Sequence, residues 1–229
     1  MASQLWNDVL ILSRQMMICQ TPANSEASNA EAKARLAAQI LNLRLLASRL
    51  HEGEKFYRHL KGVVRTWQED LPDEAVSAIK SLTKYFDGNN SPLSILRRKI
   101  GFHSDYKFIM ASLGDIGETH LEEFVGDTIL NTIFMSGEIA NIAALPSIVS
   151  GASASEALKR LVGDCLQAMA WTYDACQGYH RWFLNCYVLP HIPTIEDGPL
   201  VDLTDAPAFE DLRFRFFANA DGLIQAMTS

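Results

Sequence analysis

The sequence lacks the features that mark several special classes of protein. No apolar run approaches the roughly 20 residues needed to cross a bilayer, so no membrane-spanning helix is expected. No basic segment precedes the first apolar stretch, Val9 to Leu12, so no secretory signal is expected either. With 48% hydrophobic and 21% charged residues, the composition is that of an ordinary globular protein. We therefore expect a folded cytoplasmic protein that does not bind a membrane.

Motifs of the large enzyme classes and of metal sites are also absent. The sequence has no Gly-rich phosphate loop, no H-E-x-x-H and no G-x-S-x-G. Its four cysteines form no C-x-x-C pair, so neither a zinc site nor a redox disulfide is expected. Neither a metal ion nor another cofactor is therefore expected. Cys165, Cys176 and Cys186 are about three helical turns apart, which predicts buried thiols on one helix face.

Charge is divided unevenly along the chain. The net charge is −7, but residues 1–110 hold 15 Lys and Arg against 11 Asp and Glu, whereas residues 111–229 hold 5 against 16. Any contact with nucleic acid must therefore use a local basic surface in the first half. The densest basic segment runs from Lys33 to Arg65, and within it Arg58, Lys61 and Arg65 recur at helical spacing. They are candidate RNA phosphate ligands, although the same pattern is typical of a solvated helix face.

The hydrophobic periodicity is mostly helical and predicts an all-α fold. Ser91 followed by Pro92 is a helix start, and that helix is expected to continue to His103. Gly53 is expected to interrupt the helical pattern of the first third of the chain. The expected helices span 3–19, 29–50, 54–69, 74–86, 92–103 and 155–190, and a last helix opens at Pro207.

We interpret this order of elements as an antiparallel helical bundle with extra C-terminal helices. Residues 1–150 form its main helical domain, with room for one short β-hairpin near 121–134, where glycines punctuate β-branched and aromatic residues. Residues 151–229 form a helical extension packed on the same core. Its long helix is expected to bury a stripe that includes Cys165, Phe183 and Tyr187.

His103 is the candidate catalytic residue. It follows Arg97, Arg98 and Lys99, whereas the other five histidines are expected to be packed or exposed without a catalytic role. An imidazole exchanges protons near neutral pH, and an arginine can stabilise the negative charge of a pentacoordinate phosphorane. This combination of residues suits phosphoryl chemistry without a metal ion.

The spacing of these residues raises a geometric problem. On an ideal helix, Arg97 and Arg98 lie about 120° and 140° from His103, so neither shares its face. Either the helix distorts near Gly101, or the long arginine reaches round, or the site is completed across a two-fold dimer. Lys99 does share the face of His103 and is a candidate phosphate ligand.

A family resemblance bears on this stretch. The run Arg97-Arg98-Lys99-Ile100-Gly101-Phe102-His103-Ser104-Asp105 resembles the signature of the HEPN superfamily, an arginine four to six residues before a histidine. It is most similar to the abortive-infection branch, in whose register Arg97 is the family arginine and Lys99, Phe102, His103 and Asp105 also match. Gly126-Asp127 and Asn131-Thr132 resemble the segment that follows the motif in that branch. The resemblance covers residues 1–150.

The resemblance implies a helical bundle that acts as a metal-independent endoribonuclease, serving as a toxin or in phage defence. The RNA 2′-hydroxyl would attack its own phosphodiester in the cleft of a homodimer. His103 would be the general acid or base, and Arg97, or Arg98 at the shorter spacing, would stabilise the phosphorane. An antitoxin or a nucleotidyltransferase would be a fitting partner. The chain departs from the family at Arg98, where Asn, Asp or His is common, and at Tyr106, which lies three rather than two residues after His103.

Two other interpretations stay open. One is a catalytically inactive HEPN-like module that binds a nucleotide or a protein partner, with His103 and its arginines as anion ligands or helix-end structure. The other is a helical interaction protein with no site. Arg97 or Arg98 of one copy close to His103 of a two-fold mate would favour the enzyme, whereas a buried and self-satisfied His103 would favour the alternatives.

Overall fold

The computed structural model describes residues 2–20, 29–63, 70–101, 105–114, 123–126 and 132–192, with the backbone only for 2, 20 and 60–63. Within these ranges the fold is all-α, which confirms the predicted fold class. The seven α-helices are α1 (Ala2–Gln20), α2 (Asn29–Val63), α3 (Asp73–Phe86), α4 (Pro92–Lys99), α5 (Tyr106–Leu113), α6 (Met135–Ala144) and α7 (Ala154–Phe183). The helix expected from Pro207 lies outside the described residues.

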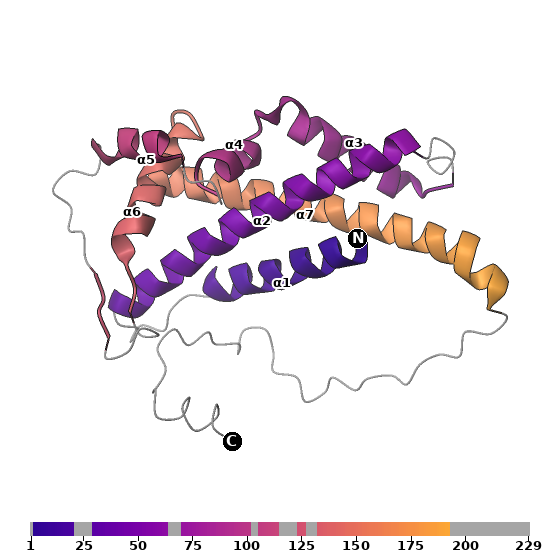
Figure 1. Ribbon diagram of the computed structural model, residues 1–229, viewed down its shortest axis with the longest axis horizontal. Helices are drawn as coiled ribbons and strands as arrows, with labels where there is room; N and C mark the ends of the chain where they lie inside the picture. The colour runs from indigo at the N-terminus through magenta and orange to yellow at the C-terminus, as the bar shows by residue number, and fades with distance from the viewer. Residues whose placement is uncertain are drawn as a thin grey trace, which may run out of the picture.

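Three long helices form the body of the bundle. Figure 1 shows α1, α2 and α7 running side by side, with α1 antiparallel to α2. The shorter helices cover this body: α3 packs mainly on α7, α4 contacts both α2 and α7, and α5 and α6 pack together at one end. The end of α4 is therefore held against the middle of α2.

One hydrophobic core joins these helices. Its buried side chains come from α1, α2, α3, α4 and α7, and include Leu5, Val9, Leu46, Leu50, Leu82, Phe86, Leu96, Leu161 and Cys165. Each aliphatic or aromatic side chain of this size contributes roughly 1.5–3 kcal/mol when it leaves water. Because α7 supplies part of this cluster, the long C-terminal helix belongs to the centre of the fold.

Gly53 does not interrupt the second helix, contrary to expectation. A single helix, α2, runs through it from Asn29 to Val63. A Cβ atom at Gly53 would lie 2.8 Å from the Cδ2 atom of Leu5, so the glycine allows α1 to approach α2 closely. Close packing of α1 on α2, rather than a break in the helix, explains the glycine at this position.

Helix α4 is shorter than predicted. It begins as expected, with Pro92 at its first position and the Ser91 hydroxyl accepting a hydrogen bond from the Ser94 amide. It ends at Lys99, however, so the expected continuation to His103 is wrong. Ile100 and Gly101 both donate their amides to the Leu96 carbonyl. A Cβ atom at Gly101 would lie 2.3 Å from the Arg97 carbonyl oxygen, which explains why glycine occupies this position.

The outer end of α7 also departs from the predicted buried stripe. Cys165 and Cys176 are buried, but Cys186 is exposed, as are Phe183 and Tyr187. Figure 1 shows this end of α7 extending past the other helices, and a π-helical segment, Leu184–Val188, follows α7. The hydrophobic pattern of α7 continues to Tyr187, but the helices that pack on α7 end before this point. The last residues of the pattern are therefore exposed.

Of the expected β-hairpin at 121–134, the described residues contain one antiparallel bridge, in which Phe124 and Ile133 exchange two backbone hydrogen bonds of 3.0 and 2.7 Å. Within the described ranges no strand extends from it. No described helix combines the length and the apolar character needed to cross a membrane.

Candidate functional site

The two candidate arginines lie on the last turn of α4. Arg97 is half-buried and Arg98 is exposed. Neither guanidinium forms an ion pair with any carboxylate among the described residues. His103 lies outside the described residues, so the structure gives no distance between His103 and these arginines. The ideal-helix angles that suggested a shared site across a dimer do not apply, because α4 ends at Lys99.

Lys99 has a different role from its neighbours. Its Nζ atom lies 2.6 Å from the Asp105 carboxylate and 5.5 Å from the centre of the Phe108 ring. The Asp105 amide donates to the Lys99 carbonyl at 2.8 Å, and its carboxylate caps α5 by accepting from the Phe108 amide. The hydrogen bond from Lys99 lowers the pKa of the Asp105 carboxyl. The predicted phosphate ligand is therefore engaged in joining α4 to α5.

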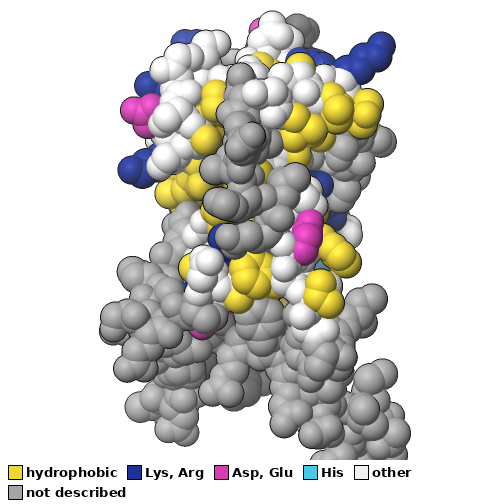
Figure 2. Space-filling view, turned by 90° about the vertical axis from the view of Figure 1, so that its left-hand side faces the viewer, with side chains coloured by type: hydrophobic (Ala, Val, Ile, Leu, Met, Phe, Trp, Pro, Cys, Tyr) yellow, Lys and Arg dark blue, Asp and Glu magenta, His cyan; other side chains and the backbone are white. Residues whose placement is uncertain are grey.

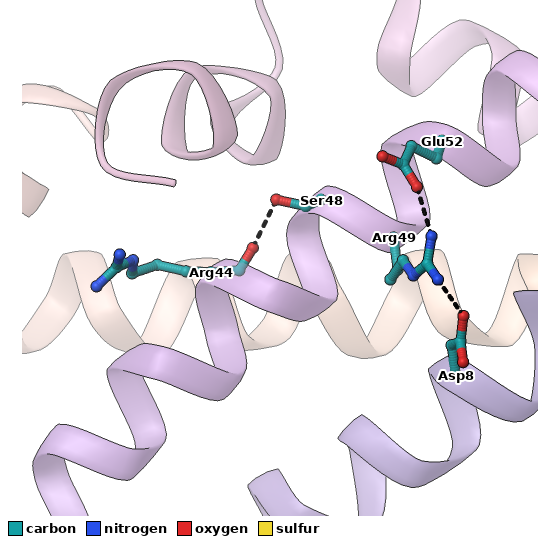
Figure 3. Close-up of polar contacts among 5 residues, drawn as sticks. All are labelled: Asp8, Arg44, Ser48, Arg49 and Glu52. Atoms are coloured by element: carbon teal, nitrogen blue, oxygen red, sulfur yellow. Dashed lines mark hydrogen bonds and ion pairs between the residues drawn. The ribbon is translucent and has the colours of Figure 1, made fainter. Parts of the chain in front are cut away.

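Arg44 of α2 reaches the same end of α4 from the other side. Its Nη2 atom lies 3.5 Å from the Gly101 carbonyl oxygen, and its Nη1 atom lies 3.7 Å from Glu138 of α6. Both contacts are long, and the buried Nε atom has no hydrogen-bond partner among the described residues. Figure 3 shows that Arg44 and Arg49 point in different directions from α2. Sequence reasoning placed Arg44 in the basic segment but not beside the motif.

His51 forms a buried polar cluster with Ser94 and Ser91 at the start of α4. Its Nδ1 atom shares a 3.3 Å hydrogen bond with the Ser94 hydroxyl, which in turn accepts a 2.8 Å bond from Ser91. Burial, and then the nearby cations Arg97 and Lys55, lower the pKa of His51 to about 4. His51 is buried, which is one of the two environments expected for the histidines outside the motif. Its proximity to Arg97 was missed, because the two are 46 residues apart.

We expect this cluster to make the protein less stable in mild acid. Unfolding releases His51 from its low pKa of about 4 to an ordinary value near 6.5, so the unfolded chain binds more protons between these two pH values. Stability should therefore fall as the pH drops through this window, by about 3 kcal/mol in all. Denaturant unfolding of wild type and His51→Gln at pH 7 and pH 4 measures the difference. His59→Gln, at an exposed histidine of the same helix, is the control and should change nothing; an equal pH dependence in His51→Gln would refute the assignment.

Arg58, Lys61 and Arg65 are the three residues of the predicted basic stripe. Of these, only Arg58 is described with its side chain. The Arg58 Nε atom lies 2.6 Å from the carboxylate of Glu54, which is buried, and its Nη2 atom lies 3.8 Å from Asp87. The Lys61 side chain and Arg65 lie outside the described residues. Arg58 is about half-exposed and its charge is already matched by two carboxylates, so it is a weaker phosphate ligand than its spacing suggests.

A groove between α1 and α2 was not predicted. It has a volume of about 460 Å³ and is lined by Asp8, Ile11, Leu12, Gln15, Leu45, Ser48, Arg49 and Glu52. Figure 3 shows the Arg49 guanidinium bridging Asp8 of α1 and Glu52 of α2, the latter at 2.7 Å. Arg49, the one cation among the described residues that line the groove, is therefore already paired with carboxylates. Asp8 and Arg49 are 41 residues apart, so their pairing carries no local sequence signal.

Exposed hydrophobic side chains gather near the end of the bundle that holds α5 and α6. Tyr106 and Met110, one turn apart on α5, are 72% and 44% exposed, and Phe134 is 68% exposed. Figure 2 shows this face, where hydrophobic side chains lie among scattered basic ones. Tyr106 directly follows Asp105, so this apolar surface begins next to the Lys99–Asp105 pair.

No family model, curated protein or solved structure matches this chain in the three comparisons made.

Proposed function

We propose that this chain is a HEPN-like RNA-binding protein that cleaves RNA without a metal ion, in the manner of cytoplasmic toxins and phage-defence nucleases. The observation that carries the proposal is the pairing pattern at the end of α4. Lys99 is engaged by Asp105, whereas the guanidinium groups of Arg97 and Arg98, the two arginines that the motif offers, have no carboxylate partner among the described residues. Unpaired arginines suit a ligand with phosphate oxygens.

The proposed chemistry needs only a proton carrier and cations. The 2′-hydroxyl oxygen attacks the adjacent phosphorus while the bond from phosphorus to the 5′-oxygen breaks. His103 takes the proton from the 2′-hydroxyl and passes it to the leaving 5′-oxygen, or it carries out one of these two transfers while water carries out the other. Arg97 or Arg98 stabilises the charge that builds up on the phosphorane oxygens. The products are a 2′,3′-cyclic phosphate and a free 5′-hydroxyl.

A homodimer remains part of the proposal, although the angular argument for it no longer applies. Its support is the exposed pair Tyr106 and Met110 on α5, next to the Lys99–Asp105 pair. Symmetric burial of one such patch is the usual way in which two identical chains associate. Light scattering of the full chain should therefore give a dimer, and a monomer at micromolar concentration would remove this part of the proposal.

Cleavage in the presence of EDTA tests the proposed function directly. The full chain is incubated with a broad panel of single-stranded RNAs, and the product ends are identified by mass spectrometry. We expect 2′,3′-cyclic phosphate ends that do not depend on added metal. No cleavage of any RNA would defeat the enzymatic proposal and leave a catalytically inactive module that binds a nucleotide or a protein.

The same assay should distinguish the roles of Arg97 and Arg98. If Arg97 is the family arginine, Arg97→Ala should slow cleavage by about tenfold or more, because the phosphorane loses one donor while neighbouring cations remain. Arg97→Lys should recover little, since lysine keeps the charge but lacks the planar pair of donors. If Arg98→Ala slows cleavage instead, the shorter spacing is the working register. Lys80→Ala, at an exposed lysine of α3, is the control for loss of one positive charge.

A further inference from the structure

Helix α4 packs along α2 in antiparallel orientation, beside the middle of the longer helix (Figure 1). The register between them is set by three contacts: Arg44 with Gly101, His51 with Ser94, and Arg58 with Asp87 just before α4. Residue numbers therefore rise along α2 as they fall along α4. In this register Arg97 lies about one turn from His51 toward Arg44, and Lys55 lies one turn from His51 in the other direction.

The polar residues along this contact share one face of α2. They recur every three or four positions and so lie within about 60° of one another around the helix axis: Arg44, His51, Lys55 and Arg58. Arg97 is one turn after Ser94, whose hydroxyl bonds to His51, so it lies on the side of α4 that faces α2. We call these four residues of α2, together with Ser94 and Arg97, the α2–α4 seam.

Carboxylates match the cations at the ends of the seam but not those in its middle. Arg44 and Arg58 both lie near carboxylates of the fold. Neither Lys55 nor Arg97 forms an ion pair with any of the described residues. Lys55 is exposed and Arg97 is half-buried, so a ligand in solvent can reach both.

The middle of the seam is a place of positive potential. Burial is the main cause of the low pKa of His51, and the charges of Arg97 and then Lys55 are the next causes. Both cations therefore lie close enough to act on one imidazole, although they come from different helices. Glu52 acts in the opposite sense, but it is paired with Arg49. Two unmatched cations on either side of a neutral group repel each other, and a bound anion would remove this repulsion.

We propose that the α2–α4 seam binds the RNA backbone, with Arg97 and Lys55 contacting two phosphates of one strand. Their levels along the seam differ by about two helical turns, or roughly 10 Å, and both side chains are long. A strand of RNA presents a row of phosphates, for which Arg and Lys are the usual ligands. The inference rests on the proposed function, because Arg97 is one of the two arginines proposed to hold the scissile phosphate. Lys55 adds a contact away from the reacting atoms.

The salt dependence of RNA binding tests the inference. Fluorescence anisotropy with the full chain measures the affinity for a labelled single strand of about 12 nucleotides at about 0.1 to 1 M salt. The strand is 2′-O-methyl RNA, which lacks the attacking hydroxyl and so stays intact. Each phosphate contact with a single strand adds about 0.7 to the slope of log affinity against log salt. Lys55→Ala should therefore lower the slope by about 0.7, which is about a fivefold loss of affinity at 0.1 M salt and little loss at 1 M.

Matched variants show whether the lost charge acts at the seam. Lys55→Arg should keep the wild-type slope, because the charge remains. Lys80→Ala removes a positive charge from an exposed lysine of α3 and should also leave the slope unchanged. Lys55→Ala combined with Arg97→Ala should lower the slope by about 1.4, because two contacts are lost. The thermal unfolding midpoint of Lys55→Ala should match that of wild type, since Lys55 holds no carboxylate among the described residues.

Three results would overturn the inference. The first is an unchanged slope in Lys55→Ala, or no binding of the strand by wild type. The second is an equal change in Lys80→Ala, which would make the effect one of net charge. The third is tighter binding of poly-glutamate than of RNA of equal charge, which would assign the seam to an acidic protein partner. Wild-type cleavage with an unchanged slope in Lys55→Ala would refute the seam alone, and a seam effect without wild-type cleavage would refute the nuclease alone.

Discussion

His103→Ala should lower the rate of RNA cleavage by about a hundredfold or more, the usual effect of removing a positioned proton-transfer group. A histidine can take up and return a proton at neutral pH because its unperturbed pKa is about 6.5. The arginines at the end of α4 cannot replace it, since a guanidinium stays protonated throughout this range. The rate is measured by gel or mass spectrometry on one RNA substrate, with EDTA present, at several pH values.

Three accompanying results make this prediction specific. The thermal unfolding midpoint of His103→Ala should match that of wild type, because a side chain that meets RNA has to be accessible. His59→Ala, the same substitution at an exposed histidine of α2, should cleave normally. Products of wild type should end in 2′,3′-cyclic phosphate. Cleavage that persists at the wild-type rate in His103→Ala would remove His103 from the mechanism.

Structural features that depend on residues close together in the sequence could be predicted, whereas contacts between helices could not. The Ser91-Pro92 start of α4 is a short-range effect of one hydroxyl and one fixed backbone angle, and it is found as predicted. Gly53 gives the same local signal whether it breaks a helix or admits a neighbouring Leu5, and only the packing of α1 decides between the two. The end of α4 is decided in the same way, by the turn at Gly101 and the Lys99–Asp105 pair.

The candidate site shows the same division. Arg97, Arg98 and Lys99 were identified by their spacing, but spacing could not show that Lys99 pairs with Asp105 while the other two have no carboxylate partner among the described residues. His51 could have been found with Lys55 and Arg58, because they follow it by four and seven residues and share a helix face. The electrostatic effect of Arg97 of α4 on His51 required the fold, as did the approach of Arg44 to Gly101.

The pair formed by Arg58 and Glu54 leads to the second large prediction: Arg58→Ala should destabilise the protein by about 4 kcal/mol at pH 7. Glu54 is 2% exposed, so removing its cation leaves a buried carboxylate without compensation. Removing one partner of a buried ion pair costs about 3–5 kcal/mol, because the remaining charge is left buried and unpaired. The free energy of unfolding, measured in urea, gives the loss.

A double variant tests this explanation. Glu54→Gln combined with Arg58→Ala should recover much of the stability at pH 7, because a neutral amide needs no cation. Arg49→Ala is the matched control: its partners Asp8 and Glu52 are both partly exposed, so the loss should be about 1 kcal/mol or less. A loss for Arg58→Ala that is equally small at pH 7 would show that Glu54 does not depend on this ion pair.

This prediction also decides how the basic stripe is best tested for RNA binding. A triple replacement of Arg58, Lys61 and Arg65 would mix a loss of folding with a loss of phosphate contacts, since Arg58 holds Glu54. Lys55, one turn earlier on α2, has no ion-pair partner among the described residues and is exposed. Its replacement removes a charge without exposing a buried carboxylate, so any change in the salt dependence of RNA binding would report a phosphate contact.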